Sequence, residues 1–340
     1  MGCVLSPPAA VTPEALASVL DRGWGLKVAS VAYRPVGFGS HHWETVDADG
    51  GRWWVTVDDL AMKASGPAFD RLHASLAAAQ ALREHGRGFA VAPLTASDGR
   101  CVVRIKGGGP EGLGGGEIND RYAVALYPYL EGQHFSWGEF STPEHRRATL
   151  DMVLGVHTAP EAVRDGVARD DFTVGHRAEL EFTLDSEAAP AAGPYGRAVV
   201  DLLRTHADPI RHLLAHYDGL VALARERSDR AVLTHGEPHP GNTMLTADGW
   251  VLIDWDTAMV APPERDLWLI EPGDGSVLAA YAEAAGVAPR ASMLELYRIR
   301  WELADIAVEV GRFRRGHDGS ADDDAAWRIL SSTVESLAQT

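Results

Sequence analysis

Two acids and an amide in the second half of the sequence have the chemistry and the spacing that phosphoryl transfer requires. Glu237 precedes Asn242 by five positions, and Asp254 directly follows the apolar residues 251–253. In such a site one carboxylate orients the attacking hydroxyl, while an amide oxygen and a second carboxylate hold magnesium on the triphosphate. The sequence therefore predicts a phosphotransferase, with Glu237 facing the hydroxyl and with Asn242 and Asp254 as magnesium ligands.

The segment between these residues predicts how they meet. Asp248-Gly249 is a turn signal between two short strands, so a hairpin would return Asp254 to the side of Asn242. The Gly, Pro and His content of residues 235–242 would also suit an ordinary surface loop. We favour the hairpin, because this loop leads into a strand that ends in an acid.

Two histidines flank Glu237 and raise a second possibility, a zinc site. His235 and His239 are four positions apart, which is the spacing that zinc peptidases use on one helical face. Pro238 and Pro240 disfavour a helix at this place, because proline fixes its own backbone and lacks an N–H. Zinc is therefore not expected.

Two further acids follow the hairpin. Asp256 could join the metal ligands or could cap the next turn through backbone hydrogen bonds, and the sequence favours neither. Asp266, in the segment 264–268, is expected to brace the loop rather than to contact a substrate.

A glycine-rich segment in the first fifth of the chain is a candidate contact for the triphosphate. Gly37, Phe38, Gly39 and Ser40 lie between two predicted strands. The backbone N–H groups of such a hairpin can point at phosphate oxygens. An ordinary hairpin would explain the segment equally well.

A predicted helix near the C-terminus carries candidates for acceptor binding. Glu302, Asp305 and Glu309 share one face of the helix expected over residues 291–314. That face would attract a cationic acceptor, although acidic stretches are commonly just solvated. Trp301 beside it could stack on a ring of the acceptor or fill the core.

Around these residues the pattern predicts two lobes. Strands are expected over residues 26–36, 42–46, 52–57, 101–105 and 122–129, with helices at 13–22 and 69–84 and a flexible stretch at 107–116. Beyond residue 132 helices dominate: 145–157, part of 164–185, 195–206, 211–227, 276–285, 291–314 and 322–338. The prediction is a small antiparallel sheet followed by a mainly helical lobe.

Composition narrows the class of partner. A chain of 340 residues with a net charge of -17 suits a two-lobed enzyme and argues against nucleic-acid partners. Cys3 and Cys101 are the two cysteines, so no disulfide framework is implied. The sequence has no apolar run long enough for a membrane span and no secretory signal. We expect a cytoplasmic protein without a membrane partner.

The segment 235–242, together with Ile253-Asp254-Trp255-Asp256, resembles the aminoglycoside phosphotransferase family, and the likeness extends over most of the chain. It looks most like the branch of the spectinomycin phosphotransferases. The resemblance implies a bilobal, protein-kinase-like α+β fold, with residues 1–127 as the nucleotide-binding lobe and 128–340 as the helical lobe with the acceptor pocket. It implies ATP, Mg²⁺ and a small-molecule hydroxyl acceptor, for example a cationic antibiotic, in a monomer or homodimer. The connector residues Tyr127, Tyr129 and Leu130 would face the adenine.

Three positions depart from the family pattern. The family usually has Asp where this chain has Glu237, and it ends the third strand in a phosphate-pairing Lys where this chain offers Thr56. Lys63 is the nearest ammonium beyond that strand. The inserted helix also lacks the Glu that pairs with the family's Lys. These losses keep two alternatives open, a non-catalytic binding protein on the same fold and an enzyme that transfers a different group, such as a nucleotidyl unit.

Overall fold

An antiparallel sheet forms the first lobe in the computed structural model, which describes residues 4–63, 67–105, 121–186, 193–226 and 230–337. Its strands are β1 (Val28–Arg34), β2 (Ser40–Asp47), β3 (Arg52–Asp59), β4 (Val103–Arg104) and β5 (Tyr122–Pro128). They lie in the order β1-β2-β3-β5-β4, and every pair of neighbours is antiparallel. The five predicted strands are present, and β4 is shorter than expected. The predicted flexible stretch at 107–116 lies outside the described residues.

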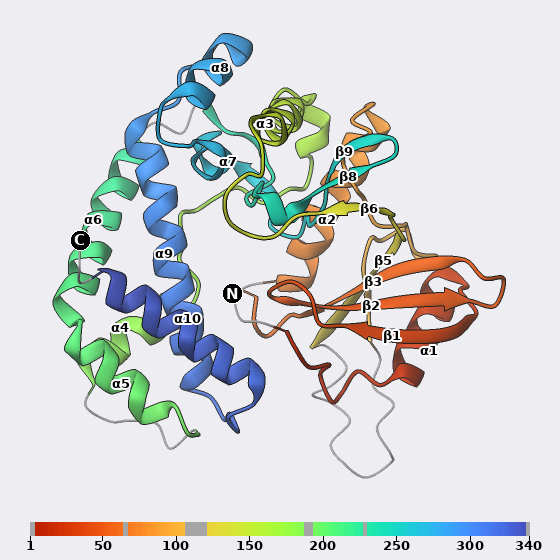
Figure 1. Cartoon of the computed structure of the whole chain (residues 1–340), viewed down its shortest axis with the longest axis horizontal. Coiled ribbons are helices and arrows are strands. Elements are labelled where there is room, and N and C mark those ends of the chain that lie inside the picture. The colour runs from red at the N-terminus through yellow and green to blue at the C-terminus, as the bar shows by residue number, and fades with distance from the viewer. Residues whose placement is uncertain (1–3, 64–66, 106–120, 187–192, 227–229, 338–340) are drawn as a thin grey trace.

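Each face of this sheet packs on a different helix. Alternating side chains such as Val55 and Val57 point to α1 (Pro13–Trp24), whose buried residues belong to the same core. On the other face, Ala123 and Ala125 pack with α2 (Ala68–Glu84). That second core also contains residues of the hairpin that carries the predicted metal ligands. The sheet, α2 and the hairpin are therefore one packed unit (Figure 1).

Helices make up most of the second lobe (Figure 1). They are α3 (Pro143–His157), a 3₁₀ turn (Glu161–Arg164), α4 (Arg177–Asp185), α5 (Gly196–Thr205), α6 (Ala207–Arg225), α7 (Glu264–Ile270), α8 (Ser276–Ala285), α9 (Ala291–Phe313) and α10 (Ala321–Leu337). The long helix α9 contacts α4, α6, α7 and α10 and forms the centre of the largest helical core. Within the described residues, no helix is long and apolar enough to cross a membrane.

Two small sheets inside the helical lobe position the predicted site residues Glu237, Asn242 and Asp254. The strands β6 (Gly132–His134), β8 (Thr243–Thr246) and β9 (Gly249–Leu252) form one, and β7 (Val232–Thr234) pairs with β10 (Met259–Ala261) in the other. The hairpin β8–β9 turns at residues 247–248, as expected from the sequence. The sequence pattern did not reveal β6 or the β7–β10 pair, which are three residues long in each strand.

Candidate active site

The loop that contains Glu237 begins where β7 ends and is fixed by a buried carboxylate. Asp266, at 0% exposure, accepts hydrogen bonds from the backbone N–H groups of His235 (2.9 Å) and Gly236 (2.6 Å). Its Oδ2 also lies 3.0 Å from Nε2 of His157, at the end of α3. Burial opposes ionisation of Asp266, but the hydrogen bond and charge of His157 outweigh it and lower the pKa of the carboxyl. Asp266 therefore braces the loop, as the sequence predicted.

Gly236 holds a backbone conformation that glycine tolerates and other residues rarely adopt, with φ at +102°. A Cβ atom there would lie 2.4 Å from the guanidinium nitrogens of Arg265. Arg265 itself donates hydrogen bonds to Oγ1 of Thr234 and to the carbonyl of Thr257. The glycine thus lets a cation approach the backbone immediately before Glu237.

The predicted metal ligands are brought together by the hairpin. The backbone N–H of Ile253 donates to the carbonyl of Asn242 at 2.9 Å, which sets Asp254 beside Asn242. Nδ2 of Asn242 donates to the carbonyl of Glu237 at 3.0 Å, so this amide is tied to the loop as well. Asp254 has a left-handed backbone, with φ at +65°, an uncommon state for a residue other than glycine.

Both ring nitrogens of His235 are committed within the protein. Its Nε2 lies 2.8 Å from the carbonyl of Ile253, and its Nδ1 accepts the N–H of Glu237 at 3.2 Å. His235 is therefore not free to bind zinc. For the second histidine, burial and then the neighbouring His235 lower the pKa of His239 to about 3, so His239 is neutral. In the described part of the chain, no group of three or more His, Cys, Asp or Glu side chains is arranged to hold a metal.

Three carboxylates near this loop interact electrostatically. Burial, and then the charge of Asp256, raise the pKa of Glu237 to about 7. Asp254 is exposed as a residue, yet protein atoms around its carboxyl and then the charges of Asp256 and Glu237 raise its pKa well above the usual value. Burial opposes ionisation of Asp256 too, but contact with Lys63 outweighs it and lowers the pKa. The group carries excess negative charge, and a divalent cation would relieve it.

The residues predicted to contact the triphosphate lie at the turn from β1 to β2 and on β3. Gly37 and Gly39 have positive φ, Phe38 is 47% exposed, and Ser40 begins β2 with its side chain buried. Thr56 lies in β3 opposite His42 and Ala125. No lysine stands on this strand.

The connector residues face different surroundings. Burial, followed by the charges of Asp58 and Asp254, raises the pKa of Tyr127 well above its usual range. Tyr129 instead stacks under Arg52, whose guanidinium carbon is 3.7 Å from the ring centroid. Leu130 is half-buried at the start of the second lobe.

A cavity of 1320 Å³ opens next to Glu237 and Asp256. Trp301 and Asp305 of α9 line it, as does Trp268 of α7. Trp301 is stacked on Trp137, with ring centroids 5.2 Å apart. Among the residues predicted to bind nucleotide, only Gly39 lines this cavity, so the cavity lies beside the loop that contains Glu237 and is separate from most of the other predicted nucleotide contacts.

The predicted acidic face of α9 does not act as one surface. Asp305 lines the cavity, but Glu302 and Glu309 do not. Glu309 is 1% exposed and lies 3.1 Å from Nε of Arg312. Helical spacing placed the three acids on one side, whereas tertiary packing buries the last of them. The expectation of a three-acid ligand surface is therefore corrected to a single acid, Asp305.

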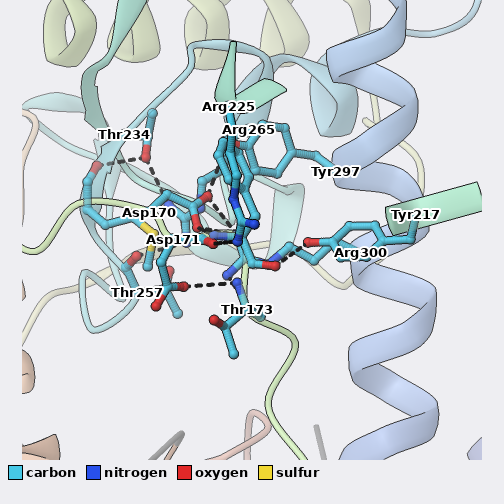
Figure 2. Close-up of polar contacts among 12 residues, drawn as sticks. Asp170, Asp171, Thr173, Tyr217, Arg225, Thr234, Thr257, Arg265, Tyr297 and Arg300 are labelled. Carbon is cyan, nitrogen blue, oxygen red and sulfur yellow. Dashed lines mark hydrogen bonds and ion pairs between the residues drawn. The ribbon is translucent and has the colours of Figure 1, made fainter. Parts of the chain in front are cut away.

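In the wall of the cavity, a polar network around Asp170 connects α9 to β10, because the N–H of Asp170 donates to the carbonyl of Val260 at 2.9 Å (Figure 2). Asp170 accepts hydrogen bonds from Arg300, at 2.6 and 2.8 Å, and from the hydroxyl of Tyr297 at 3.0 Å. Arg265 lies next to them in the same view. Tyr297, Arg300 and Arg265 all line the cavity, so its wall is held by paired and rigid groups.

Several site residues were missed by sequence reasoning. They are Asp58, Trp137, Trp268 and Arg265, together with the cleft position of Lys63. Asp58 gave the clearest signal, because it ends an apolar strand on the same face as Thr56, two positions earlier. The others depend on contacts between segments far apart in sequence.

The sequence of this chain matches a known protein family. Residues 33–303 match the phosphotransferase enzyme family (APH). Protein StrN of Streptomyces griseus is 33% identical in an alignment of 267 positions, which covers 74% of this chain and 73% of StrN.

Solved structures with low sequence identity share the fold. Spectinomycin phosphotransferase APH(9)-Ia, in complex with ADP and spectinomycin, has a TM-score of 0.67 at 15% identity, covering 97% of this chain and 99% of its own. Amicoumacin kinase hAmiN, in complex with AMP-PNP, Ca²⁺ and Ami, has a TM-score of 0.58 at 12% identity, covering 97% and 94%. The expected bilobal, kinase-like α+β fold is confirmed.

Proposed function

Because the chain belongs to the phosphotransferase enzyme family, we propose that it transfers the terminal phosphate of ATP to a hydroxyl group of a small molecule. The observation that carries this proposal is the meeting of Glu237 and Asp254 beside Asn242, next to a cavity large enough for a drug-sized acceptor. Nucleotides bound in the similar solved structures support ATP as the donor.

Magnesium fits the residues at this place. Asn242 uses its Nδ2 for Glu237, so its Oδ1 can serve as a hard oxygen ligand, and Asp254 supplies a carboxylate. Burial and then the charges of Asp256 and Glu237 raise the pKa of Asp254, so a cation bound there would favour its ionised form. Bound there, magnesium would neutralise charge on the phosphates.

We propose Glu237 as the general base that takes the proton of the acceptor hydroxyl. Its carboxylate accepts a hydrogen bond from the acceptor hydroxyl and takes the proton as the oxygen bonds to the terminal phosphorus and the bond to ADP breaks. A pKa of about 7 suits this exchange at neutral pH. Asp266 holds the loop in place through two backbone hydrogen bonds.

The cavity favours an acceptor that combines a ring with a cationic group. Trp301 and Trp268 offer aromatic surface, and Asp305 offers a carboxylate within the same cavity. We propose an aminoglycoside or aminocyclitol as the acceptor class. The spectinomycin in the similar solved structure supports this class.

The test is product analysis with matched variants. The wild type is incubated with Mg²⁺, ATP and a panel of aminoglycosides, aminocyclitols, nucleosides and amino alcohols. The masses of the products are then measured by mass spectrometry. Glu237→Gln and Asp254→Asn should each lower turnover by about 100-fold or more. Asp248→Asn, at the exposed hairpin turn, is the control and should retain wild-type turnover.

Product mass separates the alternatives. A gain of one phosphoryl group supports the proposal, and a gain of one nucleotidyl group replaces it with nucleotidyl transfer. Thermal stabilisation by an acceptor without any product would instead favour a binding protein, the function suggested by the missing strand lysine.

A further inference from the structure

Lys63 lies in the cleft although it follows β3 by four residues. The sequence contains three lysines, Lys27, Lys63 and Lys106. Lys27 pairs with Asp21 at the surface, where its side chain is 72% exposed, and Lys106 lies outside the described residues. Lys63 is 24% exposed and lines the cavity together with Glu237 and Asp256. A lysine whose side chain is mostly covered, in a chain with three lysines, requires a specific reason.

Two carboxylates from different segments hold this ammonium. Its Nζ is 2.7 Å from Oδ1 of Asp58, and it also contacts Oδ2 of Asp256. Burial alone would lower the pKa of Lys63, but the charges of Asp256 and Asp58 outweigh it and raise the pKa, so Lys63 is a cation. Its charge also acts on Asp254 and Glu237.

Asp58 connects Lys63 to the glycine-rich segment. Oγ of Ser40 donates to the same Oδ1 of Asp58 at 2.6 Å, and Asp58 is 2% exposed. Asp58 and Thr56 point to the same side of β3, because side chains two positions apart share a face. Lys63 therefore occupies the point where the glycine-rich hairpin, the third strand and the segment after Asp254 meet.

The inserted helix contributes no acid at this point. Ser75 of α2 faces the same segment and donates a hydrogen bond to the carbonyl of Ala258 at 2.8 Å. The acids that pair with the cleft lysine are thus Asp58, on the strand, and Asp256, after the hairpin, rather than an acid of the helix.

Building on the proposed function, we propose that Lys63, oriented by Asp58, binds the phosphates of ATP in place of the missing strand lysine. The Lys63–Asp58 pair then replaces both halves of the lost lysine–glutamate pair. Its contact with Asp256, two residues after Asp254, puts a positive charge near the place where the phosphates and the metal would meet. The expected effect of the ammonium is on the phosphates and not on the base or the sugar.

The experiment compares ligands that differ only in the number of their phosphate groups. Dissociation constants of ATP, ADP and adenosine are measured by titration calorimetry, with Mg²⁺ present and no acceptor. Lys63→Met should weaken ATP about 10- to 100-fold, the loss expected for a charged hydrogen bond, and leave adenosine within about twofold. Lys63→Arg should retain most of the affinity for ATP. Lys27→Met is the matched control and should bind all three ligands as the wild type does.

A second variant separates phosphate binding from a structural role. Removing Lys63 alone leaves Asp58 and Asp256 without their cation, which can destabilise the fold. The double variant Lys63→Met, Asp58→Asn removes the ammonium and the charge of its more buried partner and should fold, as checked by thermal unfolding, yet still bind ATP about 10-fold or more weakly. An equal loss for adenosine and ATP, or unchanged ATP affinity with a changed acceptor KM, would overturn the proposal for Lys63. Failure of the wild type to bind ATP at all would instead reject the proposed function.

Discussion

At the residue scale, Glu237 differs from the expected aspartate by one methylene group and also by its setting. The longer side chain reaches further from a loop that Asp266 fixes by two hydrogen bonds. Its carboxyl shares the surroundings of Asp254 and Asp256, and only Lys63 and Arg265 lower its pKa appreciably among nearby side chains. The raised pKa is therefore a consequence of burial plus neighbouring acids.

This leads to a prediction about pH. A carboxyl with a folded-state pKa near 7 is protonated below that pH and cannot accept the acceptor proton. The kcat/KM for the acceptor should therefore rise with pH and level off above about 7, with a slope of roughly one on a logarithmic scale below it. The measurement is the pH profile at fixed low Mg²⁺.

The magnesium dependence provides the control for that profile. Higher Mg²⁺ favours the ionised carboxylates, so the midpoint should move to lower pH. A profile that is flat from about pH 5 to pH 8 would contradict the role given to Glu237.

At the element scale, the site depends on short strands that hold loops rather than on long regular elements. The pair β7–β10 aligns Thr234 with Met259, and so keeps the loop that contains Glu237 beside the segment that follows Asp256. The hairpin β8–β9 brings Asp254 back beside Asn242. These pairings explain how residues nearly twenty positions apart reach one place.

Gly236 offers a test of this arrangement. Gly236→Ala should lower kcat about 10-fold or more while the protein stays folded, because the new Cβ must displace Arg265 or the loop. Gly249→Ala is the matched control: its φ is +117°, so the backbone strain is similar, but nothing lies within 4 Å of the new Cβ. Both variants are assayed for kcat and thermal unfolding. Equal losses of activity in the two would mean that backbone strain alone, and not the contact with Arg265, governs the loop.

At the scale of the whole molecule, the segment before α1 connects the two lobes. The hydroxyl of Tyr33 in β1 donates to the carbonyl of Val4, and the N–H of Leu5 donates to Oδ1 of Asp322 in α10 at 2.5 Å. Val4 and Pro8 line the cavity. This N-terminal segment therefore closes one side of the space beside Glu237.

Asp322→Ala should weaken this closure. We expect the acceptor KM to rise about threefold to tenfold while the KM for ATP changes little, because the lost contacts border the cavity. Asp201→Ala, which breaks a surface pair with Arg197 on α5, is the control and should leave both constants unchanged. A larger effect on ATP than on the acceptor would show that the segment serves nucleotide binding instead.

Much of the fold could be read from the sequence because it rests on local patterns. Strand alternation, the turn signal at 248–249 and helical spacing predicted the five-stranded sheet and the helices of the second lobe except the short helix α7. The spacing of Glu237, Asn242 and Asp254 likewise predicted a shared site, since one hairpin suffices to bring them together. The family resemblance, now supported by the match over residues 33–303, came from the same segment.

Tertiary packing decided what local pattern could not. Periodicity put Glu309 on the face of Asp305, but in the folded chain Glu309 is buried and paired with Arg312. The partner of Lys63 was equally hidden, because Asp58 and Asp256 are separated by nearly two hundred positions and meet only when the lobes pack together. The sequence by itself determined which side chains could do chemistry; the folded chain decided which of them share a charge environment, because electrostatic coupling depends on distance in space and not along the chain.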